Sequence, residues 1–328
     1  MIGPADSLDT RVLAIVGPTG VGKTALAEEL AVRLGGEIVS ADSMQVYRGM
    51  DIGTAKPPPE ERRVPYHCID LVDPGEPFSA ALFQREARAA IAELAGRNML
   101  PVVAGGTGLY VRAALDRMDF PRGEQTANPV RERYERFAAE NGAVALHGLL
   151  VQRDPAAAAC IHPNNARRVI RALEMADEGI SYAEQSAGFS SRESVYDTHH
   201  IGLTMEREAL YARIDERVDA MLETGLIGEV ERLLSGGFRD ALTAAQAIGY
   251  KEFVPVIEGR ADRDEAVAAV KQASRRYAKR QLTWFRSDPR IRWIDVTEMS
   301  SQQAASAALD AIDWAAPPMS SGDRRNGP

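Results

Sequence analysis

A phosphate-binding loop follows directly after an apolar stretch near the amino terminus. The loop consists of Gly17, Pro18, Thr19, Gly20, Val21, Gly22, Lys23 and Thr24. Residues 12–16 before it read Val-Leu-Ala-Ile-Val, and residues 25–31 after it are rich in helix formers. This order predicts a strand, a loop and a helix whose N–H groups and positive end converge on a polyphosphate. Lys23 adds a positive charge and Thr24 a hydroxyl suited to Mg²⁺.

Two of the loop glycines are expected for a physical reason. A side chain at Gly17 or Gly22 would hold the backbone away from the phosphate oxygens. The loop does not say which molecule carries the phosphates. ATP is the usual ligand of such a loop, and other features of the sequence are needed to identify the ligand here.

Strand and helix patterns alternate through the first third of the chain. Strands are expected at 12–16, 37–40 and 100–104, and helices at 23–34 and 79–96. This alternation predicts an α/β fold, a P-loop NTPase-like parallel sheet flanked by helices. Residues 41–43 and 105–108 follow two of the strands. Because ligands of parallel sheets bind beyond the carboxyl ends of the strands, both segments should face the phosphate-binding loop.

The middle of the chain changes to helical patterns at 128–141, 144–151, 154–160 and 165–178. We therefore predict a catalytic core from residues 10–116 and 200–314, with a helical insertion domain at 117–199. Within the second part of the core, strands are expected at 199–203 and 292–296, and helices at 206–222, 225–235, 243–258 and 262–286. Residues 315–328 are rich in Pro, Ser, Gly and charge, so we expect a disordered tail.

Composition narrows the class of protein. The two cysteines, Cys68 and Cys160, form no CxxC pair, which argues against a disulfide framework and a structural zinc site. We expect both to be buried thiols. The chain has no apolar leader and no stretch long enough to span a membrane, which indicates a cytoplasmic protein without a membrane partner.

A basic and aromatic segment, residues 275–292, stands out from the net charge of −8. It holds Arg275, Arg276, Lys279, Arg280, Arg286, Arg290 and Arg292 against one acid, Asp288, with Tyr277, Trp284 and Phe285 among them and Trp293 directly after. Clusters of this kind form nucleic-acid surfaces, but a solvated helix with its aromatic residues in the core has the same composition.

Acidic residues are placed unusually for an ATPase. The strand at 100–104 ends in Gly-Gly-Thr-Gly and lacks the acid that commonly supports Mg²⁺. The acids of residues 69–73 keep a hydrolase possible. Asp42, after the second strand, is the more prominent acid. It is a candidate base for an acceptor substrate, or simply a turn residue or helix cap.

Residues 42–57, Asp-Ser-Met-Gln-Val-Tyr-Arg-Gly-Met-Asp-Ile-Gly-Thr-Ala-Lys-Pro, resemble the hallmark segment of bacterial tRNA dimethylallyltransferases. The phosphate-binding loop is similar to another block of that family. Further similar blocks follow in family order at 105–110, 162–164, 171–174, 248–252 and 279–286. The resemblance extends from about residue 12 to 295 and is far more specific than the loop alone.

The resemblance implies transfer of a dimethylallyl group from dimethylallyl diphosphate to N6 of the adenosine next to the anticodon. The tRNAs concerned read codons that begin with U. The phosphate-binding loop would then hold the diphosphate leaving group, with Mg²⁺ at Thr24 and with Lys23 and Arg217 stabilising the developing charge. Asp42 would be the general base and Thr107 a hydrogen-bonding partner beside the reacting atoms. Without the family, Arg217 would be taken for a surface arginine and Thr107 for a helix cap.

The resemblance also implies a set of contacts to the tRNA anticodon stem-loop. The target base would leave its stack and enter the site, where Asp42, Ser43, Met44, Gln45 and Thr107 would touch it or its neighbours. The helical insertion would grip the stem-loop. Its expected RNA contacts are Arg131, Arg167, Arg168, Val169, Ile170 and Arg171. One anticodon arm per chain indicates a monomer.

Three rival functions remain open. An adenylate isopentenyltransferase makes the same bond on free AMP or ATP, but needs neither a long insertion nor a basic segment. A small-molecule P-loop kinase would use ATP as donor and a hydroxyl as acceptor, which the 42–57 segment argues against. A nucleotide-dependent RNA-binding switch would bind ATP or GTP tightly and catalyse no alkyl transfer.

Overall fold

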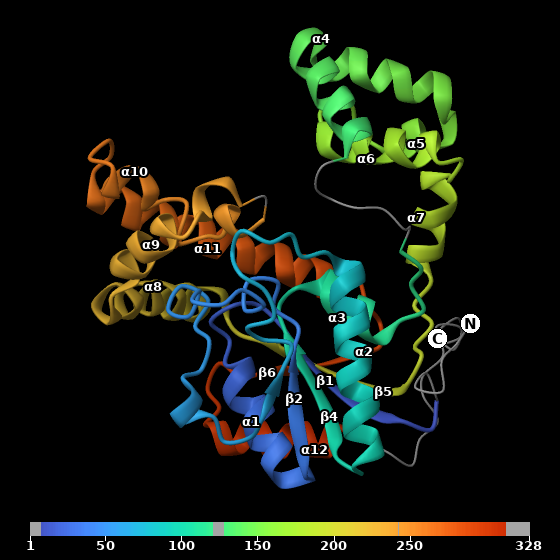
Figure 1. The fold of residues 1–328 in the computed structure, drawn as a ribbon. Helices are drawn as coiled ribbons and strands as arrows, with labels where there is room; N and C mark the ends of the chain where they lie inside the picture. Colours follow the sequence, from blue (N-terminus) through green and yellow to red (C-terminus); the bar gives the residue numbers. More distant parts are fainter. Residues whose placement is uncertain (1–7, 121–127, 242, 313–328) are drawn as a thin grey trace. The chain divides into compact units, whose positions relative to one another are not determined.

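A computed structural model of the chain describes residues 8–120, 128–241 and 243–312 (Figure 1). Its centre is a six-stranded sheet in the order β3-β2-β4-β1-β5-β6, and every pairing is parallel. The strands are β1 (Arg11–Val16), β2 (Gly36–Ser40), β3 (Tyr66–His67), β4 (Leu100–Gly105), β5 (Asp197–Thr204) and β6 (Ile291–Asp295). The predicted α/β fold with a parallel sheet is confirmed.

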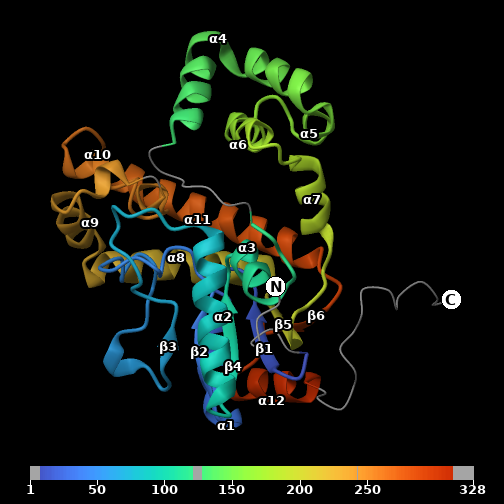
Figure 2. The same cartoon turned by 45° about the vertical axis from the view of Figure 1, so that its right-hand side comes forward.

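Helices cover both faces of this sheet (Figure 2). They are α1 (Lys23–Leu34), α2 (Ala80–Gly96), α3 (Gly108–Leu115), α8 (Arg207–Thr224), α9 (Leu226–Ser235), α10 (Val254–Ile257), α11 (Arg263–Arg286) and α12 (Ser301–Ala311), with 3₁₀ turns at Pro59–Glu61, Phe238–Asp240 and Ala244–Gln246. The step from β1 to β2 runs opposite to the step from β2 to β4. Right-handed crossovers therefore place α1 and α2 on opposite faces.

One large core cluster forms where a face of the sheet packs against α1. Leu13 and Ile15 of β1 are fully buried against Leu26 and Leu30 of α1, and α12 joins the same cluster. Local signals set the helix ends: Ser79 caps α2, and Ser300 forms a capping box at the start of α12. The phosphate-binding loop lies between β1 and α1, and both of these elements belong to this core.

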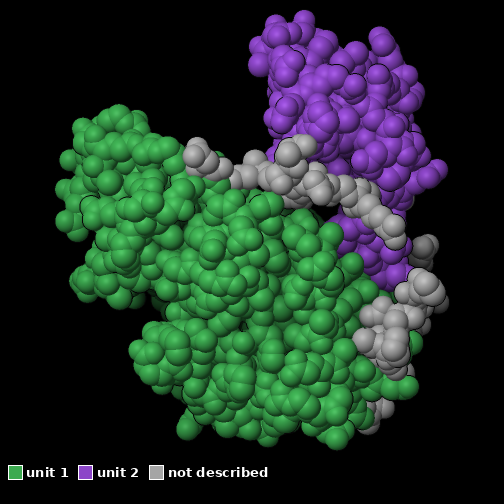
Figure 3. Space-filling view, in the orientation of Figure 1, with its two compact units in different colours: residues 1–116, 193–328 green, residues 117–192 purple. Residues whose placement is uncertain are grey.

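The chain divides into two compact units, residues 1–116 with 193–328 and residues 117–192 (Figure 3). The second unit begins where the sequence placed the insertion and ends a few residues earlier, because β5 begins at Asp197. Its helices are α4 (Pro129–Arg153), α5 (Pro155–Cys160), α6 (Ala166–Asp177) and α7 (Tyr182–Ser190). Gly142, at φ 83°, interrupts α4 between the two helices that the sequence indicated.

One predicted helix, 243–258, is wrong for most of its length. Only Ala244–Gln246 and Val254–Ile257 are helical, because Gly249 adopts φ +90° and the fully buried Tyr250 turns the chain inward. Strand β3 and helices α3, α7 and α12 lay outside the predicted elements. Five of the eight residues of α3 are buried, so it has no polar face to give a helical period. The expected disordered tail, 315–328, lies outside the described residues.

Among the helices that the structure describes, none combines the length and apolar character needed to cross a membrane.

Candidate active site

The phosphate-binding loop turns sharply between β1 and α1. Gly17 has φ +147°, and a Cβ there would lie 2.7 Å from the carbonyl oxygen of Leu203 in β5. Gly22 has φ +98°, although a Cβ at this residue would have space around it. Packing against β5 therefore requires glycine at position 17, and the backbone conformation favours glycine at position 22. These two reasons add to the one expected from the sequence, the close approach of phosphate to the backbone.

The loops after β2 and β4 join directly at the same edge of the sheet. The Ala41 amide donates to the Ala104 carbonyl at 2.8 Å, and the Thr107 amide donates to the Ala41 carbonyl at 3.2 Å. The hydroxyl of Thr107 accepts from the Ser43 amide at 3.0 Å and donates to the Ser43 hydroxyl at 3.2 Å. These bonds place Thr107 beside the segment that carries Asp42.

Helix α11 connects these loops to the phosphate-binding loop through Gln281. The buried side chain of Gln281 accepts from the Thr19 amide at 2.9 Å and donates to the Gly106 carbonyl at 2.9 Å. Both loops therefore lie beside the phosphate-binding loop, as expected for loops at the carboxyl ends of parallel strands. One turn earlier, Tyr277 hydrogen-bonds to Thr107 and Gln281, and burial together with the charge of Asp42 raises its pKa to about 12.

The sequence interpretation missed Tyr277 and Gln281 as site residues. A signal for Gln281 was present, since this amide interrupts an apolar stripe formed by Ala278 and Phe285. A polar side chain on the buried face of a helix needs partners within the protein. Here its partners are the two loops.

Two cations and one carboxylate interact across the site. Burial and the charge of Arg217 lower the pKa of Lys23 to about 7, and Asp42 opposes this shift. Burial also lowers the pKa of Arg217, again opposed by Asp42. Lys23 donates to the carbonyl of Pro18, in its own loop, at 2.6 Å. Closely placed cations of this kind favour the arrival of a polyanion, because its charge removes their mutual repulsion.

Two cavities meet at Asp42. The smaller, about 80 Å³, is lined by Lys23 and Thr24 and extends to apolar residues such as Ile38 and Ala104. The larger, about 450 Å³, is lined by Met44, by residues 246–251, which include Ile248, and by residues of α8 and α11. Their shared lining residues are Thr19, Asp42, Thr54, Arg217 and Tyr277. A donor held by the loop and an acceptor in the larger cavity would therefore meet beside Asp42.

The donor set of the smaller cavity suits Mg²⁺ only together with phosphate. Thr24 offers a hydroxyl to the ion, and the Asp42 carboxylate in the same lining is the candidate base rather than a metal ligand. Within the described part of the chain, no group of three or more His, Cys, Asp or Glu residues could hold a metal ion. Mg²⁺ commonly binds through one or two protein groups, several waters and substrate phosphates, so these residues fit that ion.

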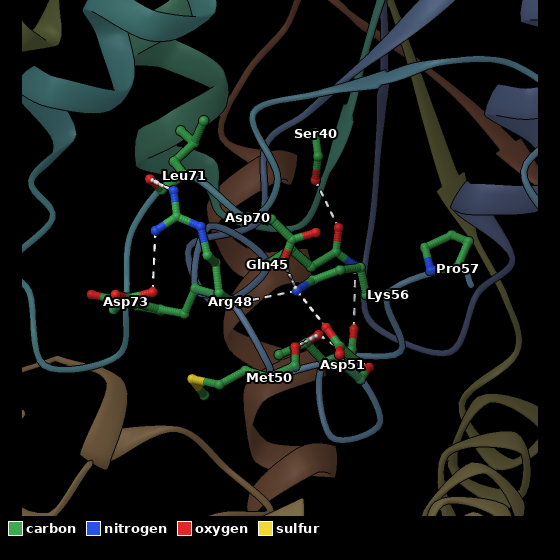
Figure 4. Close-up of polar contacts among 12 residues, drawn as sticks. Ser40, Gln45, Arg48, Met50, Asp51, Lys56, Pro57, Asp70, Leu71 and Asp73 are labelled. Carbon is green, nitrogen blue, oxygen red and sulfur yellow. Dashed lines mark hydrogen bonds and ion pairs between the residues drawn. The ribbon is translucent and has the colours of Figure 1, made fainter. Parts of the chain in front are cut away.

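The hallmark segment, residues 42–57, folds on itself through buried polar bonds (Figure 4). The side chain of Gln45 accepts a hydrogen bond from the Ser40 hydroxyl through Oε1 at 2.8 Å and donates one to the Thr54 carbonyl through Nε2 at 3.2 Å. Met44 donates its amide to Asp42 Oδ1 at 2.9 Å. Gln45 is 9% exposed and lines the smaller cavity, whereas Ser43 and Met44 line the larger one.

Lys56 fastens the end of the hallmark segment. Its side chain is 2% exposed, and Nζ lies 2.6 Å from Asp51 Oδ1 and 2.5 Å from Asp70 Oδ1 (Figure 4). Asp73 in turn pairs with Arg48 at 3.1 Å. Asp70 and Asp73 therefore form ion pairs with Lys56 and Arg48, and neither lines a cavity. They no longer favour the hypothesis that the protein is a hydrolase.

Glu229 of α9 holds the middle of the same segment. Its carboxylate is 2% exposed and accepts from the amides of Asp51, Ile52 and Gly53 at 2.9–3.2 Å. The Tyr250 hydroxyl donates to it at 2.6 Å. A Cβ on Gly53 would lie 2.4 Å from the Tyr250 ring, so this close approach requires glycine.

The residues predicted to bind RNA in the insertion have different environments. Arg167 and Arg168 are exposed. Arg131 lies 2.7 Å and Arg171 lies 3.1 Å from the buried carboxylate of Glu174. Val169 and Ile170 need correction, because α6 turns their side chains into the core of the insertion, where they are 0% and 7% exposed. These two side chains do not form an RNA-facing surface.

The basic segment, residues 275–292, divides in the same way. Arg275 pairs with Asp215 at 2.6 Å, Arg290 pairs with the buried Asp116 at 2.7 Å, and Arg292 donates to the Ala311 carbonyl. The exposed cations are Arg276, Lys279, Arg280 and Arg286. Of the two cysteines, Cys68 is buried, whereas Cys160 is exposed, so the prediction for Cys160 is wrong.

The chain matches known families and relatives over most of its length. The family described as IPP transferase matches residues 45–288, and the family described as isopentenyl transferase matches residues 10–64. The tRNA dimethylallyltransferase of Geobacillus kaustophilus is 52% identical over 88% of this chain and 91% of its own. The relative from Carboxydothermus hydrogenoformans, of the same name, is 50% identical over 88% of this chain and 93% of its own.

Solved structures give the same result. The tRNA isopentenylpyrophosphate transferase of Bacillus halodurans is 46% identical, with a TM-score of 0.67, and the match covers 92% of this chain and 97% of that one. A eukaryotic dimethylallyltransferase, described as acting on tRNA, is 30% identical with a TM-score of 0.76, and the match covers 92% and 78%. The two family matches together include the phosphate-binding loop and both neighbouring loops, and the chain belongs to the IPP transferase family.

Proposed function

We propose that this protein transfers a dimethylallyl group from dimethylallyl diphosphate to N6 of an adenosine in tRNA. The position is the adenosine 3′ to the anticodon, in tRNAs that read codons beginning with U. The names of its relatives support the reaction class and the tRNA. The observation that carries the proposal is the meeting of the two cavities at Asp42, with Lys23 and Thr24 of the phosphate-binding loop lining only the smaller one.

The loop side stabilises the leaving group. As the bond between C1 of the allyl group and the diphosphate oxygen breaks, negative charge grows on the diphosphate and the allylic carbon becomes cation-like. The loop amides, Lys23 and Arg217 are placed to stabilise that charge. Arrival of the diphosphate favours the protonated form of Lys23, whose pKa is depressed without it.

The acceptor side provides the nucleophile and removes its proton. N6 attacks C1 as the C–O bond breaks, so one C–N bond forms and diphosphate leaves with the bonding electrons. Asp42 takes the N6 proton and then passes it to water. The Met44 amide fixes Oδ1 of this carboxylate, which orients it at the junction of the cavities. Thr107 hydrogen-bonds to Ser43, the residue after Asp42, and would support this segment.

Mg²⁺ would be held by the Thr24 hydroxyl and the diphosphate oxygens. When bound, it supplies further neutralisation of the charge on the departing diphosphate. The larger cavity, about 450 Å³, is of a size to admit a flipped nucleotide. We also propose that the protein is located in the cytoplasm, because its substrate is tRNA, and that it acts as a monomer.

One assay separates this function from its rivals. Purified protein is incubated with labelled dimethylallyl diphosphate and Mg²⁺, together with tRNA, AMP or no acceptor, while ATP hydrolysis and phosphoryl transfer are followed separately. We expect label in tRNA alone and at the adenosine 3′ to the anticodon. Label in AMP would indicate the adenylate enzyme. Phosphoryl transfer would indicate a kinase, and tight ATP binding without label transfer a switch.

A further inference from the structure

Trp284 is an exposed aromatic side chain beside the active site. It is 44% exposed, whereas its neighbour Phe285 is 3% exposed. The indole lies against the turn between β4 and α3, since a Cβ on Gly108 would be 2.1 Å from its Cδ1 and Nε1 atoms. The next residue, Leu109, is 38% exposed. Burial of one edge restricts the rotamers of the indole and leaves the rest of its surface open.

The helix that carries Trp284 has several exposed cations, of which Arg280, four residues earlier, lies on the same helical face. Arg276, Lys279, Arg280 and Arg286 are the exposed cations of this part of α11. The sequence holds no acid from residue 266 to 287, and Asp288 is buried and paired with Arg290. An exposed tryptophan beside an exposed arginine is complementary to a base with its flanking phosphate. An acidic protein segment would match the cations but would leave the indole without an aromatic partner.

The position of Trp284 along α11 relates it to the reacting base. Tyr277 lines both cavities next to Asp42, and Trp284 follows it by two turns of the same helix. At a rise of 1.5 Å per residue, this separation is about 10 Å. Stacked nucleotides of one strand are about 3.4 Å apart, so this distance corresponds to a neighbour two or three positions from the base beside Asp42.

We propose that Trp284 is a stacking platform for an unpaired base of the RNA loop, close to the nucleotide that reacts. Arg280, four residues earlier on the same face of α11, contacts a phosphate beside it. The proposal deepens the proposed function, on which it rests. It also assigns separate tasks within α11: Tyr277 and Gln281 line the reaction site, and Trp284 with the exposed cations binds the rest of the loop.

The test uses an anticodon stem-loop RNA in which 2-aminopurine replaces single loop bases near the target adenosine. Binding and fluorescence are measured with the full-length protein and with Trp284→Phe, Trp284→Leu and Trp284→Ala. We expect Trp284→Ala to weaken binding by about 5- to 100-fold, the range for loss of one base–aromatic stack. The fluorescence change at one loop position should disappear with it. Trp284→Phe should retain most of the affinity, and Trp284→Leu should not.

Salt dependence separates stacking from charge. Trp284→Ala should leave the slope of log affinity against log salt unchanged, whereas Arg280→Gln should reduce it by about one. Val32→Ala, which alters an exposed apolar residue on α1, is the control for general loss of surface. Binding of dimethylallyl diphosphate verifies that each variant keeps its fold around the loop.

Two results would overturn the platform. One is affinity of Trp284→Ala within twofold of the parent protein, and the other is equal rescue by Leu and Phe, which would indicate packing on Gly108 alone. Failure of the proposed function looks different. In that case the parent protein would transfer no label to tRNA, whatever residue occupies position 284.

Discussion

The side-chain carbonyl of Gln281 accepts a hydrogen bond of 2.9 Å from the amide of Thr19, 262 residues earlier in the chain. The same side chain donates to the Gly106 carbonyl. One buried amide group therefore sets the distance between the phosphate-binding loop and the loop that carries Thr107. Since donor and acceptor must meet between these loops, their spacing should matter to the reaction itself.

We predict that Gln281→Leu lowers kcat/KM for dimethylallyl diphosphate by roughly 10- to 100-fold. Leucine keeps the volume but leaves the Thr19 amide and the Gly106 carbonyl without their partner, at a cost of about 1–3 kcal/mol each. Steady-state kinetics with varied donor and saturating tRNA measure the effect. Gln272→Leu, at an exposed position of the same helix, is the matched control. Equal kinetics for the two variants would contradict the spacing role.

The fold could be predicted from the sequence because its signals are local. The loop glycines, the apolar runs before the loops and the strand–helix alternation all lie within short windows, and the parallel sheet followed from them. The partners of Gln281 and Glu229 could not be predicted in this way. Gln281 meets Thr19 across 262 residues, and Glu229 meets Gly53 across 176. Only the packing of α9 and α11 on the loops brings these groups together.

The site could be predicted in part. Thr19, Lys23 and Thr24 of the loop line the smaller cavity together with Asp42 and Arg217, whereas Thr107 lines neither cavity. The arginines of the insertion and of residues 275–292 were less predictable, because charge alone does not distinguish a surface cation from one that pairs with a buried acid. Arg131 and Arg290 resemble the exposed arginines in sequence, yet Glu174 and Asp116 bind them.

Asp42→Asn should slow chemistry and spare binding. An amide retains the shape and the hydrogen bond from the Met44 amide, but it cannot take the N6 proton. We expect single-turnover transfer to fall by about 10²- to 10⁴-fold, the usual contribution of a general base. The dissociation constant for tRNA should change less than about threefold. Rapid-quench measurements with excess enzyme separate the two quantities, and near-parental transfer would remove Asp42 from this role.

Diphosphate affinity should fall as the pH rises above 7. Without ligand, Lys23 has a pKa near 7 and becomes neutral above it, whereas the bound anion favours its protonated form. Binding then takes up a proton, and the dissociation constant rises by at most about tenfold per pH unit. Titration calorimetry between about pH 6.5 and 9 measures this slope. Lys23→Met retains the titration of diphosphate itself, so an identical slope in that variant would contradict the assignment.

Glu229→Gln should destabilise the hallmark segment and weaken its use of tRNA. The carboxylate accepts bonds from three consecutive amides and the Tyr250 hydroxyl, and an amide at this position directs an N–H₂ group toward those donors. We expect a loss of about 1–3 kcal/mol in the free energy of unfolding, because buried donors lose their acceptor. Urea denaturation measures it, and Glu231→Gln, exposed on the same helix, is the control.

Tyr250→Phe removes one of these donors while leaving the three amides paired, so its effect should be smaller, about 1 kcal/mol. The double variant should be less destabilised than the sum of the two single variants, because both remove the same bond. If Glu229 positions the segment for the acceptor, the KM for tRNA will rise more than the KM for dimethylallyl diphosphate. The donor contacts the phosphate-binding loop, whereas the Glu229 carboxylate hydrogen-bonds to the amides of residues 51–53 and to the Tyr250 hydroxyl. Equal changes in both constants would instead indicate a general loss of folded protein.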